Sequence, residues 1–131
     1  MGQKIIYFVR HGEYTPYGGL SELGIRQIER VARLIQQDIR ENGIENIVIY
    51  SSPIFRATES AEIIKRTLGL EEIVVAEELD ENELRVGELV EKICKDSIDC
   101  AVLVGHRPGL ENYLGCPVEK GEVIKKIYEI K

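Results

Sequence analysis

Two histidines and two arginines stand out as the residues that could do chemistry together. His11 and His106 are the only histidines of the chain, and Arg10 and Arg56 are the arginines associated with them. A guanidinium group matches phosphate oxygens through paired N–H donors. A neutral imidazole can attack phosphorus, and nearby guanidinium charge lowers its pKa and stabilises the transferring group. These residue types predict a phosphoryl-transfer site with His11 as covalent nucleophile.

Backbone amides are expected to add donors to this site. The amides near Gly12 and those at the start of the helix after Pro53 are exposed in the predicted arrangement and could bind an anion. The expected phosphate-binding residues are therefore Arg10, His11, Gly12, Arg56 and His106. Considered alone, Arg56 could be a solvated charge on a helix surface, and His106 could be a core histidine with its hydrogen bonds satisfied. The prediction therefore depends on the placement of these residues together at one rim of the sheet.

The elements that must position these residues are buried strands. Apolar runs at residues 4–9, 46–50 and 100–104 are typical of strands covered on both faces. His11 comes just after the first run and His106 just after the third. Ligands of parallel α/β sheets bind outside the carboxyl ends of the strands, so both histidines are predicted at one rim.

Helical patterns alternate with these strands. Apolar residues at helical spacing predict a helix over 21–41. Ser52 and Pro53 have the pattern of an N-cap and a first helical residue, which puts Arg56 in the first turn of a second helix. A third predicted helix carries Val86, Leu89, Val90 and Ile93, and Pro108 is expected to open a fourth.

The alternation predicts one α/β domain over residues 1–131 with a mostly parallel sheet. Residues 73–75 form a short predicted strand, and the amphipathic segment 123–130 is expected at an edge of the sheet.

Composition narrows the function classes. The net charge of -6 argues against a nucleic-acid partner, and no apolar run is long enough to cross a membrane. The first residues lack the pattern of a signal peptide, and Cys94, Cys100 and Cys116 form no C-x-x-C pair. We therefore expect a cytoplasmic protein with free thiols, no metal site and no cofactor.

Four motifs resemble the histidine phosphatase superfamily, also called phosphoglycerate mutase-like. They are F-V-R-H-G-E at 8–13, L-S-E-L-G at 20–24, S-S-P-I-F-R-A-T-E-S-A at 51–61 and V-G-H-R-P-G at 104–109. The resemblance spans most of the chain, in the family's order. It implies a three-layer α/β/α sandwich, phosphorylation of His11 and no metal requirement. It also implies that the phosphoryl group is held by Arg10, Arg56 and His106.

Within that superfamily the chain is most similar to the short phosphohistidine phosphatases, because it lacks the long insertion that mutases and sugar phosphatases carry after the acidic segment. The resemblance implies a phosphorylated signalling protein as substrate, since an open site admits a protein surface. The family's proton donor is a glutamate in this region, and the candidates here are Glu77, Glu78, Asp80 and Glu81. Of these, Glu78 is the predicted proton donor, although a run of acidic residues is also typical of a solvated loop.

Two other functions fit the same residues. One is a small-molecule phosphomonoesterase or minimal mutase acting on a phosphorylated metabolite, with Glu78 as general acid. The other is a catalytically silent module that binds phosphorylated partners, against which the intact histidine pair argues.

Overall fold

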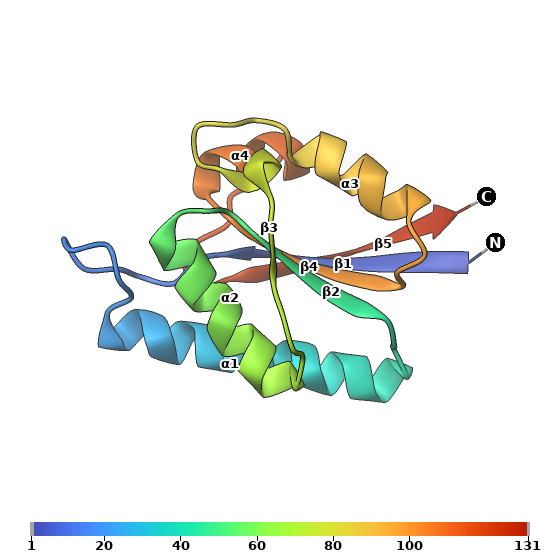
Figure 1. The fold of residues 1–131 in the computed structure, drawn as a ribbon, viewed down its shortest axis with the longest axis horizontal. Coiled ribbons are helices and arrows are strands. Elements are labelled where there is room, and N and C mark those ends of the chain that lie inside the picture. Colours follow the sequence, from blue (N-terminus) through green and yellow to red (C-terminus); the bar gives the residue numbers. More distant parts are fainter. Residues whose placement is uncertain (1, 131) are drawn as a thin grey trace.

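The computed structural model describes residues 2–130 and is built on one five-stranded sheet (Figure 1). Met1 and Lys131, the ends of the predicted domain, lie outside the described residues. The strand order is β3-β2-β4-β1-β5; neighbours among the first four are parallel, and β5 runs antiparallel to β1. The strands are β1 (Gly2–Arg10), β2 (Ile47–Ser51), β3 (Val74–Val75), β4 (Cys100–Gly105) and β5 (Val123–Ile130).

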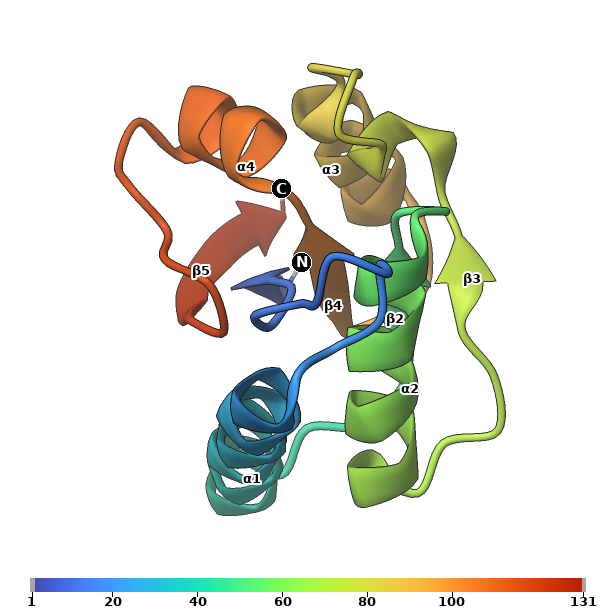
Figure 2. The same ribbon diagram turned by 90° about the vertical axis from the view of Figure 1, so that its left-hand side faces the viewer.

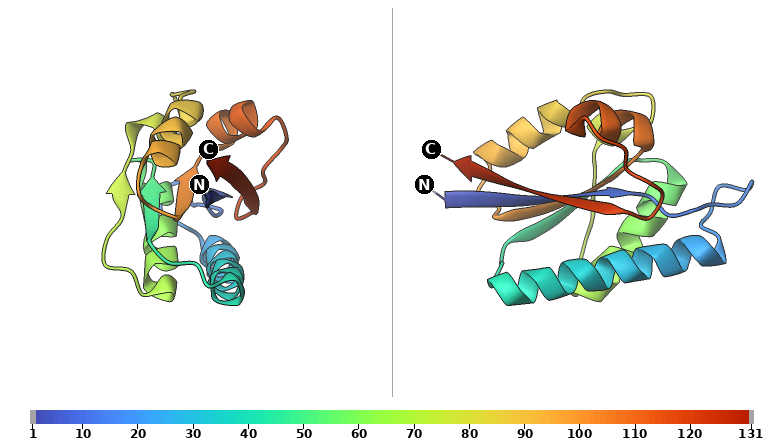
Figure 3. Two further views of the ribbon diagram at one scale, coloured as in Figure 1. Left: turned by 90° about the vertical axis from the view of Figure 1, so that its right-hand side faces the viewer. Right: turned by 180° about the vertical axis from the view of Figure 1, so that it is seen from behind.

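Helices cover both faces of the sheet. In Figure 1 and in the rear view of Figure 3, α1 and α2 lie on one side, and α3 and α4 lie on the other. The helices are α1 (Glu22–Asn42), α2 (Phe55–Leu68), α3 (Val86–Lys95) and α4 (Arg107–Leu114), and a 3₁₀ turn spans Glu77–Leu79. The predicted three-layer α/β/α fold with a mostly parallel sheet, and the amphipathic edge strand, are confirmed.

The continuous apolar runs are explained by burial on both faces. In β1, Ile6 and Phe8 pack into the cluster under α3 and α4, whereas Tyr7 and Val9 pack into the cluster under α1 and α2. Every residue of β4 is buried. This central position fixes the carboxyl ends of β1 and β4 side by side. No helix within residues 2–130 has the length and apolarity needed to span a membrane.

The two helices that lead away from the site begin differently. Ser21 caps α1, and its Oγ accepts a hydrogen bond from Gly24 N at 3.1 Å. Ser52 was expected to cap the second helix, but the N-cap of α2 is Ile54, which makes no side-chain cap bond. The Ser52 hydroxyl instead lies 2.8 Å from Nε2 of His106. Arg56 still falls in the first turn of α2.

Candidate active site

The two histidines meet at the carboxyl ends of neighbouring parallel strands. Arg10 and Gly105 are paired residues of β1 and β4, and His11 N donates to Gly105 O at 3.2 Å. The ring centroids of His11 and His106 are 5.0 Å apart, and each residue is 3% exposed. Figure 2 looks onto this end of the sheet. The parallel register of β1 and β4 thus brings the two histidines together at one rim of the sheet, as the sequence predicts.

His11 is held with one nitrogen available for attack. Its Nδ1 lies 2.9 Å from the carbonyl oxygen of Gly12, which can only accept, so Nδ1 carries the proton. The lone pair is then on Nε2, which accepts a hydrogen bond from Arg56 Nε at 3.3 Å. Burial, together with His106, Arg56 and Arg10, lowers the pKa of His11 from 6.5 to about 4 against the opposing effect of the Gly12 bond. A neutral imidazole with its lone pair on Nε2 is a nucleophile at neutral pH.

Gly12 serves the site through its carbonyl group. Its amide donates to Ser60 Oγ at 3.2 Å and is therefore occupied, which differs from the expectation that this amide binds the anion. A Cβ on Gly12 would lie 2.6 Å from Gly24 O, and one on Gly24 would lie 1.9 Å from Glu13 O. The missing side chains let the two backbones touch, and this contact fixes the carbonyl that holds His11.

Two buried side-chain nitrogens of the cluster lack hydrogen-bond partners within residues 2–130. Arg10 Nη1 donates to Val118 O at 3.2 Å, but Arg10 Nε and His106 Nδ1 are buried side-chain atoms with no hydrogen-bond partner within residues 2–130. Burial and the Arg56 charge lower the pKa of His106 to about 4, and burial also lowers the pKa of Arg10. Because an unpaired buried donor is costly, a bound anion is the natural source of the missing acceptors.

The carboxylate in contact with this cluster is Glu81. Its Oε2 lies 2.6 Å from Arg56 Nη2 and 4.0 Å from His106 Nδ1. The structure places Glu78 differently from the expectation, because its carboxylate forms a 2.5 Å ion pair with Lys92 of α3. That pair holds the pKa of Glu78 below its ordinary value. Of the four acidic candidates, Glu81 is therefore the one whose carboxylate pairs with a residue of the cluster.

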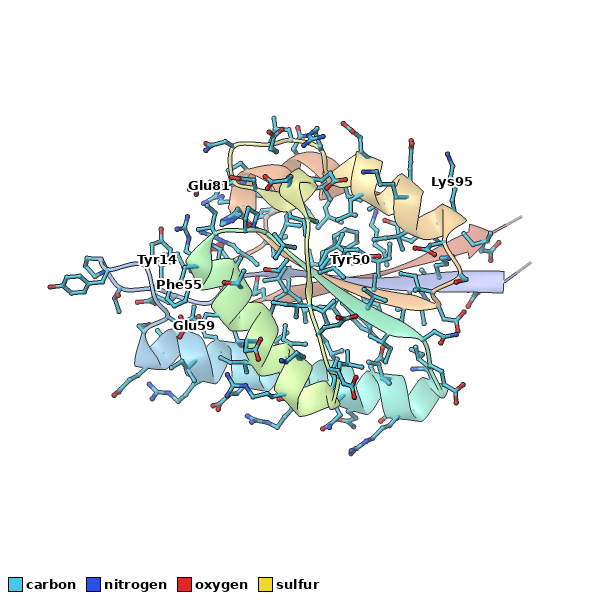
Figure 4. All side chains as sticks on the ribbon, in the orientation of Figure 1. Tyr14, Tyr50, Phe55, Glu59, Glu81 and Lys95 are labelled. Atoms are coloured by element: carbon cyan, nitrogen blue, oxygen red, sulfur yellow. The ribbon has the colours of Figure 1, made fainter. Side chains whose placement is uncertain are left out.

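Tyr14 is a site residue that the sequence analysis missed. Its ring packs edge-on against His11 with centroids 5.3 Å apart, and Arg56 Cζ lies 4.4 Å from the ring centroid. Lys120 Nζ lies 5.1 Å from the same ring. Figure 4 labels Tyr14 and Glu81 at the same end of the molecule. A tyrosine three residues after the nucleophile was the available signal.

The acidic, cysteine and histidine side chains of residues 2–130 include no group of three or more placed to hold a metal ion. The site instead gathers guanidinium and imidazole donors around the His11 lone pair. That arrangement can bind a phosphoryl group and accept it on nitrogen.

Residues 6–96 match the family model of the histidine phosphatase superfamily, branch 1. The chain belongs to this superfamily. The matched span includes Arg10, His11 and Arg56, and membership supports a phosphatase activity for the chain. No curated protein sequence is significantly similar to it.

Solved histidine phosphatases and related proteins share the fold. SixA from Agrobacterium tumefaciens is 21% identical with a TM-score of 0.66, over 87% of this chain and 76% of that one. The protein histidine phosphatase SixA complexed with tungstate is 18% identical with a TM-score of 0.65, over 90% and 80%. The mycobacterial glucosyl-3-phosphoglycerate phosphatase is 16% identical with a TM-score of 0.74, over 93% and 92%. At these identities the similarity establishes the fold of this superfamily member.

Proposed function

We propose that this protein is a metal-independent phosphatase that carries the phosphoryl group on Nε2 of His11. The observation that carries the proposal is the 2.9 Å contact of His11 Nδ1 with the Gly12 carbonyl oxygen, because it assigns the proton to Nδ1 and leaves the Nε2 lone pair beside the Arg56 guanidinium. The unpartnered donors of Arg10 and His106 support a role in binding the phosphoryl oxygens.

In the first step, His11 Nε2 forms a bond to phosphorus while the bond from phosphorus to the leaving group breaks. The charge on the phosphoryl oxygens is stabilised by Arg10, Arg56 and His106. Attack through Nε2 leaves the proton on Nδ1, where the Gly12 carbonyl continues to accept it. The phosphorylated imidazole is thereby stabilised as a cation.

In the second step, a water oxygen attacks phosphorus and the bond to His11 Nε2 breaks, releasing inorganic phosphate. Glu81 is the acid–base group that we assign to this cycle. As the carboxylic acid it donates its proton to an alkoxide leaving group in the first step, and the resulting carboxylate accepts a proton of water in the second, which restores the acid. This assignment is supported by the ion pair of Glu81 with Arg56 and by the 4.0 Å distance between Glu81 Oε2 and His106 Nδ1.

The substrate class that we propose is phosphohistidine in a signalling protein. Residues 76–85, between β3 and α3, hold only a 3₁₀ turn and a short loop, so no long insertion of that segment covers the site. A site without that insertion above it can accept a protein surface. The phosphoramidate bond also suits the site, because a protonated phosphohistidine leaves as neutral imidazole without a general acid.

A second candidate, hydrolysis of small phosphate esters, is favoured by Glu81. An ester oxygen needs a proton as it leaves, and Glu81 is in contact with a cluster residue and could supply one. The glucosyl-3-phosphoglycerate phosphatase among the structural neighbours is named for an ester substrate.

Comparing a phosphohistidine protein with a phosphoserine peptide and phosphoglycerate tests both candidates. We expect the wild type to turn over the phosphohistidine protein with the highest kcat/KM. Glu81→Gln should lower ester hydrolysis by roughly 10²-fold to 10⁴-fold and the first step on phosphohistidine much less. Glu78→Gln is the matched control, since Glu78 is paired with Lys92 instead. Higher kcat/KM for an ester would assign the second candidate, and binding without turnover of any substrate would contradict both.

A further inference from the structure

We propose that Ser52 is a positioning residue that keeps the proton of neutral His106 on Nδ1, where it is donated to the phosphoryl group. The inference rests on the proposed function for its chemical purpose, but the hydrogen bonds that carry it exist in the unliganded protein. Ser52 lies in the segment that follows β2, and His106 follows β4, so the parallel pairing of β2 with β4 brings them together.

The Ser52 hydroxyl has one proton and a defined set of neighbours. Ser52 is fully buried, and its backbone amide donates to Val104 O at 3.0 Å. Its Oγ accepts a hydrogen bond from Ile54 N at 3.2 Å and lies 2.8 Å from His106 Nε2. Within the described chain, no other acceptor is hydrogen-bonded to this hydroxyl. The hydroxyl is therefore satisfied when it donates to Nε2.

The opposite tautomer would leave two polar groups in unfavourable surroundings. If Nε2 carried the proton and donated to Ser52 Oγ, the buried hydroxyl proton would have no acceptor. His106 Nδ1 would then present a lone pair toward Glu81 Oε2, 4.0 Å away, and two acceptors would face each other. With the proton on Nδ1, the same approach is favourable. Both contacts of the His106 ring thus select one tautomer.

The selected tautomer lets His106 act without carrying a charge. Burial and Arg56 disfavour imidazolium here, so a neutral ring must supply the N–H donor. An unprotonated Nδ1 would repel the phosphoryl oxygens that the site gathers. Neutral histidine in water populates both tautomers, and the buried hydroxyl removes that freedom before substrate arrives.

Ser51 provides a matched control for this role. It is as fully buried as Ser52 and is its neighbour in the chain. Its Oγ donates to the carbonyl oxygen of Ser52 at 2.9 Å and is not hydrogen-bonded to His106. Ser51→Ala and Ser52→Ala therefore each delete one buried hydroxyl group, but only Ser52→Ala removes the hydrogen bond to the ring.

The test combines ¹⁵N NMR of the histidine rings in the unliganded protein with kinetics and thermal unfolding. We expect wild-type His106 to be protonated on Nδ1 at neutral pH. In Ser52→Ala the neutral ring should shift toward the Nε2-protonated form, and kcat/KM should fall about ten-fold to a hundred-fold. Ser51→Ala should keep the wild-type tautomer and a kcat/KM within about two-fold, even if both variants lose thermal stability.

A wild-type His106 protonated on Nε2 would overturn the inference, whether or not the variants fold. Equal tautomers and equal kcat/KM in the two variants would overturn it as well. Turnover by the wild-type enzyme distinguishes failure of the proposed function from failure of this inference. Absent turnover alongside an Nδ1-protonated His106 that shifts in Ser52→Ala would reject the phosphatase and retain the positioning role.

Discussion

Arg56 Nε lies 3.3 Å from His11 Nε2, so the guanidinium group of α2 touches the atom that we assign as nucleophile. The other end of the same guanidinium pairs with Glu81 at 2.6 Å. Arg56 thus links the proposed nucleophile to the proposed acid–base group. An incoming phosphoryl group would take up the same donors, because a guanidinium presents them in a fixed planar fork.

Replacing Arg56 with lysine keeps the charge and removes that fork. We expect Arg56→Lys to lower kcat/KM by roughly ten-fold to a thousand-fold, the scale of losing one transition-state contact. Thermal stability should change little, because Arg56 is a residue of the rim. Arg66→Lys, an exposed position in the last turn of the same helix, is the control and should keep wild-type kcat/KM. Equal rates for the two variants would contradict the assigned role.

The buried histidines predict a loss of folding stability in mild acid. Burial lowers the pKa of His11 to about 4 in the folded protein, whereas the unfolded chain titrates near 6.5. Between these values the unfolded state binds more protons, so the free energy of unfolding falls as the pH drops from about 6.5 to 4. The effect of one such histidine is on the order of 2 kcal/mol.

Urea unfolding of wild type and His11→Asn at pH 7 and pH 4.5 measures this effect. The variant lacks the titrating ring, so we expect it to lose less stability between the two pH values than the wild type does. An equal loss in both proteins would show that His11 is not held neutral by burial.

Arg10, His11 and His106 could be placed from sequence because strand ends determine their positions. The apolar runs locate the ends of β1 and β4, and parallel pairing then brings His11 and His106 together. The helix start expected at Ser52 and Pro53 was too early, since α2 begins at Phe55, but Arg56 still falls in its first turn.

The remaining contacts depend on partners far away in the sequence. Ser52 has the local pattern of an N-cap, but its hydroxyl contacts His106, which lies 54 residues later. The acidic run has no periodicity that distinguishes Glu78 from Glu81. The 3₁₀ turn and the positions of Lys92 and Arg56 decide which carboxylate pairs with which cation. These positions are determined only in the folded chain.

The close approach of two backbones predicts that Gly24 cannot carry a side chain. A Cβ there would lie 1.9 Å from Glu13 O, so backbone must move in Gly24→Ala. We expect a loss of about 2–4 kcal/mol in the free energy of unfolding and a lower kcat, because the displaced loop holds the Gly12 carbonyl. Gly87→Ala is the control, since its Cβ would meet Tyr113 at an ordinary 3.5 Å. Equal stability of the two variants would refute the contact.

Chelators should leave activity unchanged if guanidinium and imidazole groups replace a metal at the phosphoryl group. We expect the kcat/KM of protein treated exhaustively with EDTA to remain within about two-fold of the untreated value. A loss that magnesium or zinc restores would contradict the metal-independent mechanism.

Trapping the phosphorylated enzyme tests the central claim most directly. Brief incubation of wild type with ³²P-labelled substrate, quenching and peptide mapping should find acid-labile, alkali-stable phosphate on His11. The His11→Ala variant should fold, bind no covalent label and show no turnover. Label on a different residue, or wild-type turnover by His11→Ala, would contradict phosphoryl transfer through His11.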